Sequence, residues 1–411
     1  MPRALRVVLA LATTLAVSLA VSVAGCSGDH APHSPQARPG CITDFDPTAD
    51  YFPDKSTLSE ATNFAIDYRG SYQILTVNRP YLGGKPVSYV LVRCGAPAPS
   101  LTGELAHAQQ VTVPVHSLYS GSTTHLAMIT ELDRAGVVTG VANPAAVADP
   151  QIRGLIDAGE IVGYAPGGQV NIESVLRADP DVLVTQGIDD PGYPRLREAG
   201  IPVVADAEWL EPTPLGRAEW IKVFAALTGT ERQAGQVYES IRGSYRALAA
   251  QAASTKPAHV LVGTMHSGSW SMPTGASYSG RLIADAGGIY PWLADDGAEN
   301  RQLNFESVYT RAGSAPLWLV TDDWNTVGDA VARDSRYGEL TAVRTGQVWS
   351  ATKTVHAGPG LSPGNGGGNT YWERGTARPD LLLGDLIAIL HPELAPNDQV
   401  HPFEFYRQVP R

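Results

Sequence analysis

The segment 230-TERQAGQVYESIRGSYRALAAQAA-253 decides the fold of this chain. Its residues are mostly helix formers, and Thr230 followed three positions later by Gln233 has the spacing of a capping box. One apolar face follows at helical spacing, made by Val237, Ile241, Tyr245 and Leu248. At about 1.5 Å per residue the predicted helix is about 36 Å long. That length favours a helix that bridges two lobes over one that covers a single sheet.

On both sides of this helix, short apolar runs alternate with amphipathic stretches. Before it we predict strands at 111–115, 136–141, 181–185 and 202–205, separated by helices at 123–132, 172–177 and 196–199. After it we predict strands at 259–262, 316–321 and 347–350 and helices at 279–286 and 381–390. Such alternation is typical of the α/β class, with parallel sheets covered by helices. Residues 63–94 are rich in strand formers and predict a two-stranded preamble.

An internal echo supports two similar lobes. Asn171–Leu176 (NIESVL) leads into the apolar run 181–185, and Asn304–Tyr309 (NFESVY) leads into the apolar run 317–321. The two copies lie on opposite sides of the bridging helix. We therefore predict a signal peptide at 1–25, a tether at 26–45, an N-terminal lobe with its preamble at 46–213, a helical linker at 214–256 and a C-terminal lobe at 257–411.

The first residues are typical of an export signal. Arg3 and Arg6 precede an apolar run, which ends in Val23-Ala24-Gly25-Cys26, a sequence that resembles a bacterial lipoprotein cleavage box. Cys26 would then carry the lipid, and the protein would be extracytoplasmic and anchored to the bacterial cell membrane. The alternative is an ordinary signal peptide that happens to end in Cys. Cys41 and Cys94 remain, and in an exported protein they indicate one disulfide, with two buried thiols as the alternative.

The composition excludes some functions. The chain has 411 residues, of which 43% are hydrophobic and 17% charged, as in a globular protein. Its formal net charge is −11, and loss of residues 1–25 with their two arginines would bring it to −13. Nucleic acid is therefore not an expected partner, because a phosphate backbone needs a basic face. The chain has no phosphate-binding loop of the P-loop type, so it is not an ATPase.

Several phrases, in this order, resemble the ABC-transporter substrate-binding proteins for iron-siderophores and vitamin B12. They are 64–72 (FAIDYRGSY), 122–125 (STTH), 173–184 (ESVLRADPDVLV), 208–220 (EWLEPTPLGRAEW) and 371–375 (YWERG) with 378–380 (RPD). The resemblance covers roughly residues 60–395. It implies two Rossmann-like lobes joined by one long helix, with the ligand in a cleft between the lobes. It also implies a partner, an ABC permease, that receives the ligand.

The strand ends indicate where a ligand would bind, because ligands of open α/β sheets lie beyond the carboxyl ends of the strands. The hydroxyl-rich loop 117–124 leads into a helix N-terminus, so its N–H groups suit an anion or a carbonyl group. Aromatic rings and one arginine on the other loops suit a bulky, partly planar and often anionic ligand. The candidate ligand-binding residues are Tyr119, Ser120, Ser122, Thr123, His266, Trp270, Trp324, Tyr371, Trp372 and Arg374.

The permease contact is harder to place. Members of the family often have Thr-Glu in the first helix of the N-terminal lobe, and that Glu pairs with arginines of the permease. Here the matching residues are Thr124 and His125. We therefore take Glu306 as the candidate in the C-terminal lobe and Glu131 or Glu173 as the candidate in the N-terminal lobe, although each could simply lie on a solvated helix face.

Metal binding and catalysis are the weaker alternatives. The ten histidines have no His-x-x-x-His spacing, and direct binding of haem or a divalent metal would need residues such as His125, His266 and His356 to converge. Gly360-Leu361-Ser362-Pro363-Gly364 has the spacing of a nucleophile elbow, but it lacks the flanking strand and helix, and Pro363 has no N–H. Ser362 is thus a poor nucleophile for a serine hydrolase.

The sequence predicts a monomeric binding lipoprotein, without cofactor, resident metal or catalysis, that captures a ferric siderophore and passes it to a permease. A cobalamin or other corrinoid ligand is the first alternative. A haem or divalent-metal receptor is the second, and an extracytoplasmic serine hydrolase is the last.

Overall fold

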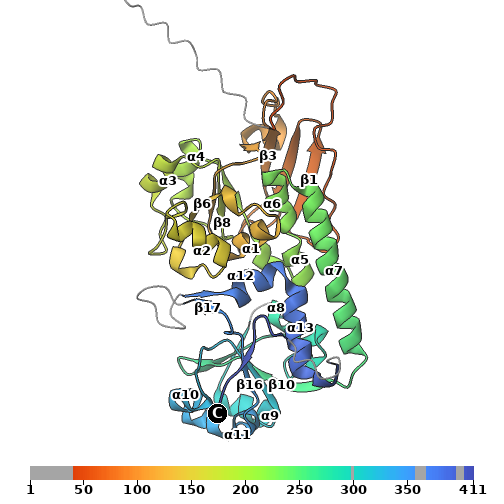
Figure 1. Cartoon of the computed structure of the whole chain (residues 1–411), viewed down its shortest axis with the longest axis vertical. Helices are drawn as coiled ribbons and strands as arrows, with labels where there is room; N and C mark the ends of the chain where they lie inside the picture. The colour runs from red at the N-terminus through yellow and green to blue at the C-terminus, as the bar shows by residue number, and fades with distance from the viewer. Residues whose placement is uncertain (1–39, 298–299, 357–366, 395–401) are drawn as a thin grey trace, which may run out of the picture. The chain divides into compact units, whose positions relative to one another are not determined.

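The long helix predicted at 230–253 is present as α7 (Glu231–Ala253) in the computed structural model, which describes residues 40–297, 300–356, 367–394 and 402–411. Its first half buries Ala234 and Tyr238 in one hydrophobic core. Its second half buries Ile241 and Tyr245 in another. One helix therefore belongs to two cores, as a bridge between lobes requires, and it runs along both lobes in Figure 1.

The start of α7 differs from the prediction in one detail. Thr230 makes no side-chain hydrogen bond to the first turn, so the capping box is not formed. The Thr230 hydroxyl instead contacts the Thr228 hydroxyl at 2.9 Å, and the Gln233 amide donates to Asp133 at 3.0 Å. The signal peptide, Cys26 and most of the predicted tether lie outside the described residues. In the part of the chain that the structure describes, no helix is long and apolar enough to cross a membrane.

The preamble is larger than predicted. It is a four-stranded sheet of β1 (Phe64–Arg69), β2 (Tyr72–Val77), β3 (Val87–Arg93) and β4 (Gln109–Val113), in that order. β4 pairs in parallel with β3, so the run predicted as the first strand of the N-terminal lobe belongs to the preamble instead. The backbone of β4 pairs with Tyr89–Arg93 of β3, while Val111 and Val113 pack into a core that the preamble shares with the N-terminal lobe.

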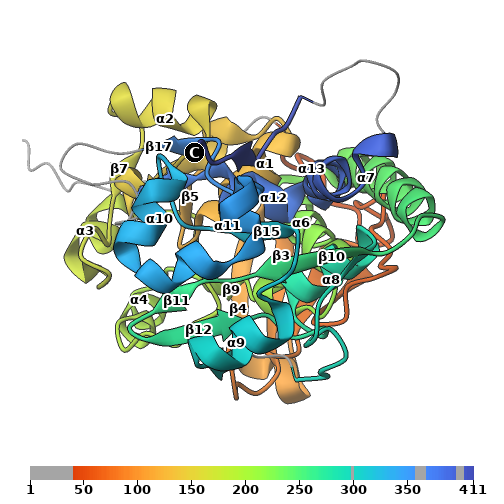
Figure 2. The same ribbon diagram turned by 90° about the horizontal axis from the view of Figure 1, so that it is seen from below.

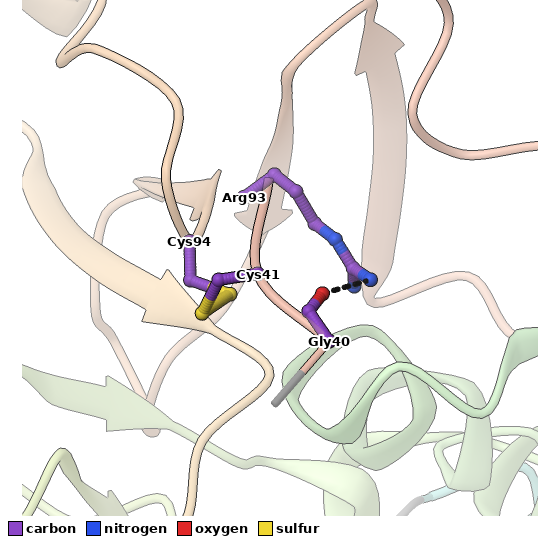
Figure 3. Close-up of a disulfide and its surroundings, with 4 residues drawn as sticks. All are labelled: Gly40, Cys41, Arg93 and Cys94. Atoms are coloured by element: carbon purple, nitrogen blue, oxygen red, sulfur yellow. Dashed lines mark hydrogen bonds between the residues drawn. A yellow bond between two sulfur atoms is a disulfide. The ribbon is translucent and has the colours of Figure 1, made fainter. Parts of the chain in front are cut away.

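A disulfide fixes the start of the described chain to this sheet. Cys41 is bonded to Cys94, which directly follows β3, across 53 positions of sequence. Figure 3 shows the bond together with the Arg93 guanidinium, which donates to the carbonyl of Gly40 at 3.2 Å. The Ile42 N–H donates to the Cys94 carbonyl at 2.9 Å. The N-terminal segment is therefore held to the edge of the fold by covalent and hydrogen bonds together.

The N-terminal lobe is a parallel sheet with the order β7-β6-β5-β8-β9. Its strands are β5 (Leu118–Ser120), β6 (Val138–Val141), β7 (Val162–Gly163), β8 (Val182–Thr185) and β9 (Val203–Ala205). Its helices are α1 (Thr123–Glu131), α2 (Pro150–Asp157), α3 (Ile172–Ala178) and α4 (Tyr193–Glu198). The central strand β5 was predicted as loop. Only Gly121 and Ser122 separate it from α1.

The second lobe has a sheet with the order β13-β10-β15-β16-β19, in which only β19 runs antiparallel. Its strands are β10 (Ala258–Val262), β13 (Gly288–Ile289), β15 (Leu317–Val320), β16 (Val348–Ser350) and β19 (Arg407–Gln408). Two small antiparallel sheets add β11 (Met265–His266), β12 (Ser269–Met272) and β14 (Arg301–Leu303), and β17 (Val355–His356) with β18 (Gly368–Asn369). The helices are α8 (Tyr278–Asp285), α9 (Phe305–Ala312), α10 (Val327–Arg333), α11 (Thr341–Thr345), α12 (Thr370–Ala377) and α13 (Pro379–Leu390).

The internal echo is a structural repeat. Asn171 caps α3 by accepting the Ser174 N–H at 3.0 Å, and Asn304 caps α9 by accepting the Ser307 N–H at 2.8 Å. Each helix then leads into a buried strand, β8 in one lobe and β15 in the other. The two lobes therefore use the same helix–strand unit, and the prediction of an α/β fold with two Rossmann-like lobes is confirmed.

Between the lobes, the helical linker α5 (Pro214–Ala218) and α6 (Ile221–Thr228) organises the chain around buried carboxylates. Glu219 is fully buried, and its carboxylate accepts the N–H groups of Ser59, Glu60 and Ala61. Its other partner is the Lys222 ammonium at 2.6 Å. Burial pulls the pKa of Glu219 upward, but these bonds outweigh it and hold the pKa below its ordinary value of 4.5.

Replacing Glu219 by Ala should destabilise the protein by about 3–5 kcal/mol, because it leaves the buried Lys222 ammonium without a carboxylate to balance its charge and three N–H groups without their acceptor. Urea unfolding at neutral pH measures this loss. Glu239→Ala is the control, because Glu239 is exposed on α7 and its ion pair with Arg242 should contribute less than about 1 kcal/mol. Since the pKa of Glu219 is lowered by folding, its stabilising effect is present above pH 4.5 and is lost on acidification. Equal losses in the two variants would contradict this account.

Candidate functional site

A hollow of about 300 Å³ lies at the carboxyl ends of β5, β6 and β8 in the N-terminal lobe. The predicted residues Ser120, Ser122 and Thr123 line it where β5 passes into α1. Ser122 also caps α1, since its hydroxyl accepts the Thr124 N–H at 3.3 Å. The N-terminus of α1 thus meets the hollow at the place where the strand-end rule predicts a ligand.

Two tyrosines form the aromatic part of this hollow. Tyr164, directly after β7, and Tyr193, at the start of α4, both line it. Tyr119 does not line it; its ring stacks behind Tyr164 with a centroid distance of 5.2 Å. Tyr119 fits there because residue 140 is glycine. A Cβ added at this position would lie 2.5 Å from the Tyr119 ring. The hollow's rigid wall is therefore built from two stacked layers of aromatic side chains.

Burial keeps these phenols neutral. It is the main cause that raises the pKa of Tyr193 to about 12 and the pKa of Tyr164 further still. The carboxylate of Asp190, which also lines the hollow, adds to both shifts through its negative charge. At neutral pH the wall therefore offers uncharged hydroxyl groups and apolar ring faces.

A second hollow of about 160 Å³ lies at the carboxyl ends of β10 and β15 in the C-terminal lobe. Tyr371 and Trp372 line it, together with Tyr406. The Trp372 indole is 49% exposed and packs edge-on against Tyr371 at a centroid distance of 4.7 Å. These two residues were predicted on a loop, but they occupy the first turn of α12. The helix fixes the direction of both rings.

Helix α12 connects the two hollows. The residue after Trp372 is Glu373, whose carboxylate accepts the N–H groups of Ala148 at 2.7 Å and Asp149 at 3.1 Å. The two residues before Ala148 line the first hollow. Gly368, just before α12, packs so closely there that a Cβ would lie 2.6 Å from the Val147 backbone. The same short helix, which lies between the two lobes in Figure 1, therefore carries aromatic residues of one hollow and holds the wall of the other.

Glu373 is almost completely buried, and this burial raises its pKa to about 7, although its two backbone hydrogen bonds act in the opposite direction. The charged groups that face it are Asp149, which raises the pKa, and Arg153, which lowers it. Glu373 is therefore a proton-sensitive link between the two lobes.

The structure does not bring all predicted residues to the hollows. Trp270 lies in β12, fully buried, and its indole N–H donates to the Val262 carbonyl at 2.9 Å. Trp324 packs on Trp318 and Tyr337 in the same core. His266 is exposed on β11 and lines neither hollow. These residues follow strands in sequence, but a local antiparallel sheet turns two of them away from the cleft side.

Arg374 also differs from its predicted role. Its guanidinium is paired with Glu404 and lies 3.7 Å from Glu131, in a separate acidic depression. The expectation of an anionic ligand rested on this arginine. The guanidinium is occupied by carboxylates of the protein itself, so that expectation loses its basis.

The candidate docking glutamates are not equivalent. Glu131 lies 3.7 Å from Arg374 and 3.6 Å from Arg378, so two arginines of the same chain face it. Glu173 is exposed in the first turn of α3, and Glu306 occupies the same place in α9, paired with Arg336 at 3.1 Å.

His125 points inward. Its ring is fully buried, with Nδ1 3.1 Å from the Ser120 hydroxyl and Nε2 3.8 Å from Asp206, and burial lowers its pKa to about 4. The His125 side chain is therefore part of the core.

Within the described ranges, no group of three or more His, Cys, Asp and Glu side chains is arranged to hold a metal ion. Ser362 and most of the glycine-rich loop lie outside those ranges.

Tyr164, Asp190, Tyr193 and Tyr406 were not singled out from the sequence. The strand-end rule could have found Asp190, because it follows β8 by five positions in a loop. Tyr406 has no such signal, since it precedes a two-residue strand near the end of the chain.

The chain was compared with known proteins. A family model described as "Periplasmic binding protein" matches residues 115–354, more than half of the chain. An uncharacterized lipoprotein of Methanocaldococcus jannaschii is 25% identical over 305 residues, which is 72% of this chain and 70% of that protein.

Solved structures share the fold at low sequence identity. A periplasmic binding protein from Veillonella parvula superposes with a TM-score of 0.56 at 11% identity, covering 79% of this chain and 99% of that one. A protein of Staphylococcus epidermidis, described as a possible iron-binding (periplasmic solute-binding) protein, gives a TM-score of 0.52 at 14% identity, covering 68% and 99%.

The buried Glu373 predicts a defined pH dependence of stability. Its pKa rises from an ordinary 4.5 to about 7 on folding, so its contribution is complete below pH 4.5 and is lost as the pH rises to 7. Urea unfolding between pH 4.5 and 8 should show that the wild type loses up to about 3 kcal/mol relative to Glu373→Gln, which cannot titrate. Parallel pH profiles for the two proteins would exclude a raised pKa at this residue.

Proposed function

The chain belongs to the periplasmic binding protein family, and from this premise we propose that it captures a ferric siderophore outside the cytoplasm and delivers it to an ABC permease. The observation that carries the proposal is the pair of hollows at strand ends, one in each lobe, linked by α12. Ligands of open α/β sheets bind at such strand ends.

The lining of the hollows suits a bulky ligand. The rings of Tyr164, Tyr193, Tyr371 and Trp372 give the hollows apolar surface, and the hydroxyls of Thr123 and Thr321 offer a few directed hydrogen bonds. This combination is typical of small-molecule sites, which are mostly apolar with a few polar groups that fix orientation. Neither hollow alone is large, so the ligand would contact both lobes at once.

The lobes are expected to move little when the ligand binds. α13 lies beside α7 in both views, and α12 packs on α1 of the other lobe (Figures 1 and 2). The Glu373 hydrogen bonds cross from one lobe to the other. A corrinoid remains the alternative ligand, because it too is bulky and partly planar. The proposed role is binding and delivery, with no chemical step.

Lipid anchoring through Cys26 would keep the receptor close to the permease. We place the permease contact on Glu173 and Glu306, because they occupy matching positions in the repeated helices α3 and α9. Matching positions on two similar lobes suit a transporter with two similar membrane subunits. Glu131 suits this role less, since its side chain is only 21% exposed and faces two arginines, whereas the Glu306 side chain is 70% exposed and faces one.

Ligand binding is tested by quenching of intrinsic tryptophan fluorescence with ferric siderophores and with cyanocobalamin. Trp372→Ala should weaken siderophore binding about tenfold, because part of the half-exposed indole would lose its contact with the ligand. Tyr309→Ala is the matched control, since Tyr309 is similarly exposed on α9 but lines neither hollow. Quenching by cyanocobalamin alone would select the corrinoid, and quenching by no ligand would refute the proposal.

Permease docking is tested with the double variant Glu173→Lys and Glu306→Lys in vesicles that contain the permease. Charge reversal should reduce the receptor's stimulation of ATP hydrolysis at least tenfold, because each substitution replaces an attraction by a repulsion. The ligand affinity should not change. Glu160→Lys serves as the control, since Glu160 is exposed at the amino end of β7, away from the strand ends that carry the hollows. Full stimulation by the double variant would remove these residues from the interface.

A further inference from the structure

We propose that the ligand is an uncharged or positively charged metal complex, and that Asp190 sets this preference. The inference rests on the proposed function, since it names the charge class of the ligand in the same site. It follows from which charged side chains reach the two hollows and which are already paired elsewhere.

The first observation is the charge of the lining. Asp190 is the single charged side chain among the described residues of the first hollow, and no Lys, Arg or His lines it. The described lining of the second hollow contains no charged side chain. The site therefore has a negative charge and no positive charge to compensate a carboxylate or catecholate.

The second observation is that the arginines near α12 and α5 are already engaged. Arg374 is paired with Glu404, and Arg378 is paired with Asp380 at 2.8 Å. Arg217 is buried against Glu208 at 3.0 Å. An anionic ligand would have to draw one of these guanidinium groups away from a carboxylate, which would leave that carboxylate unpaired.

The third observation is the fixed position of Asp190. Its Oδ1 accepts the Gly192 N–H at 2.7 Å, so the side chain is held at the start of α4. Its charge acts on the hydroxyl groups of Tyr164 and Tyr193, which line the same hollow. A cationic group on the ligand would meet a preorganised carboxylate there, whereas an anion would meet a like charge.

The N-terminus of α1 is compatible with this preference. Its partial positive charge suits the oxygen atoms that surround a ferric ion, which carry partial negative charge even in a neutral complex. In the first turn of this helix, the Thr124 N–H already donates to the Ser122 hydroxyl. The helix end can thus orient a hydroxamate complex without requiring a net negative charge on the ligand.

The test compares three ferric complexes by fluorescence quenching. They are ferrioxamine B, a trihydroxamate with a free ammonium group, ferrichrome, a neutral trihydroxamate, and ferric enterobactin, an anionic catecholate. We expect the anionic complex to bind at least tenfold more weakly than the other two. We expect Asp190→Asn to weaken ferrioxamine B binding about three- to tenfold and to change ferrichrome binding by a clearly smaller factor. Asn keeps the oxygen that accepts the Gly192 N–H.

Asp67→Asn is the control, because it removes the same charge from an exposed residue of β1 in the preamble, which lines neither hollow. Salt gives a second measurement on the unaltered protein, in which added NaCl should weaken ferrioxamine B binding and leave ferrichrome binding unchanged. Tightest binding of ferric enterobactin would overturn the inference and leave the proposed function intact. Equal effects of the two Asn variants would overturn the role of Asp190. Binding of none of these complexes, nor of cyanocobalamin, would refute the proposed function itself.

Discussion

The burial of a single helix in two cores is the constraint on which the rest of this structure depends. Ala234 and Tyr238 of α7 pack with the N-terminal lobe and its preamble, and Ile241 and Tyr245 pack with the C-terminal lobe. A shift of α7 along its axis would misplace both sets of side chains at once. Close packing of interiors makes such a shift costly, so the separation of the lobes is set by the spacing of apolar residues along one helix.

Helix α12 is the second link between the lobes, and its contacts depend on the lobe positions that α7 sets. Glu373 can accept the Ala148 and Asp149 N–H groups only if the C-terminal lobe has the correct position relative to the N-terminal lobe. The aromatic residues just before it then border one hollow while their own helix supports the other. The position of the first hollow's wall relative to α12 is thus fixed by hydrogen bonds between the lobes.

The parts of the fold that could be predicted from the sequence are those whose residue pattern extends over many positions. The bridging helix was located to within one residue, because helix formers fill its whole length of 23 residues and an apolar face repeats along its middle turns. The preamble was underestimated and β5 was missed, because a three-residue strand between two other strands has no periodicity of its own. Trp270 was misassigned because its strand pairs both with β11 and with β14, and the pairing of Trp270 with Leu303, 33 positions later, is not revealed by local sequence.

The phrase EWLEPTPLGRAEW carries much of the family resemblance, yet its side chains do not line the hollows. Glu211 accepts the N–H groups of Thr62 and Asn63, and Glu219 accepts those of Ser59 to Ala61. The recognisable motif therefore lies where the linker contacts the segment that leads into the preamble. The residues that line the first hollow, such as Asp190 and Tyr164, lie in loops without such a motif.

The Cys41–Cys94 bond closes residues 41–94 into a covalent ring that contains three of the four preamble strands. The turn between β2 and β3 is the accessible part of this ring, with the Leu82 side chain 72% exposed. A protease that nicks the chain at this turn would leave two pieces that remain connected through sulfur. The amino-terminal piece, which contains Cys41, would stay covalently bonded to the piece that contains both lobes. A single nick would therefore not separate the lobes from the amino-terminal part of the chain.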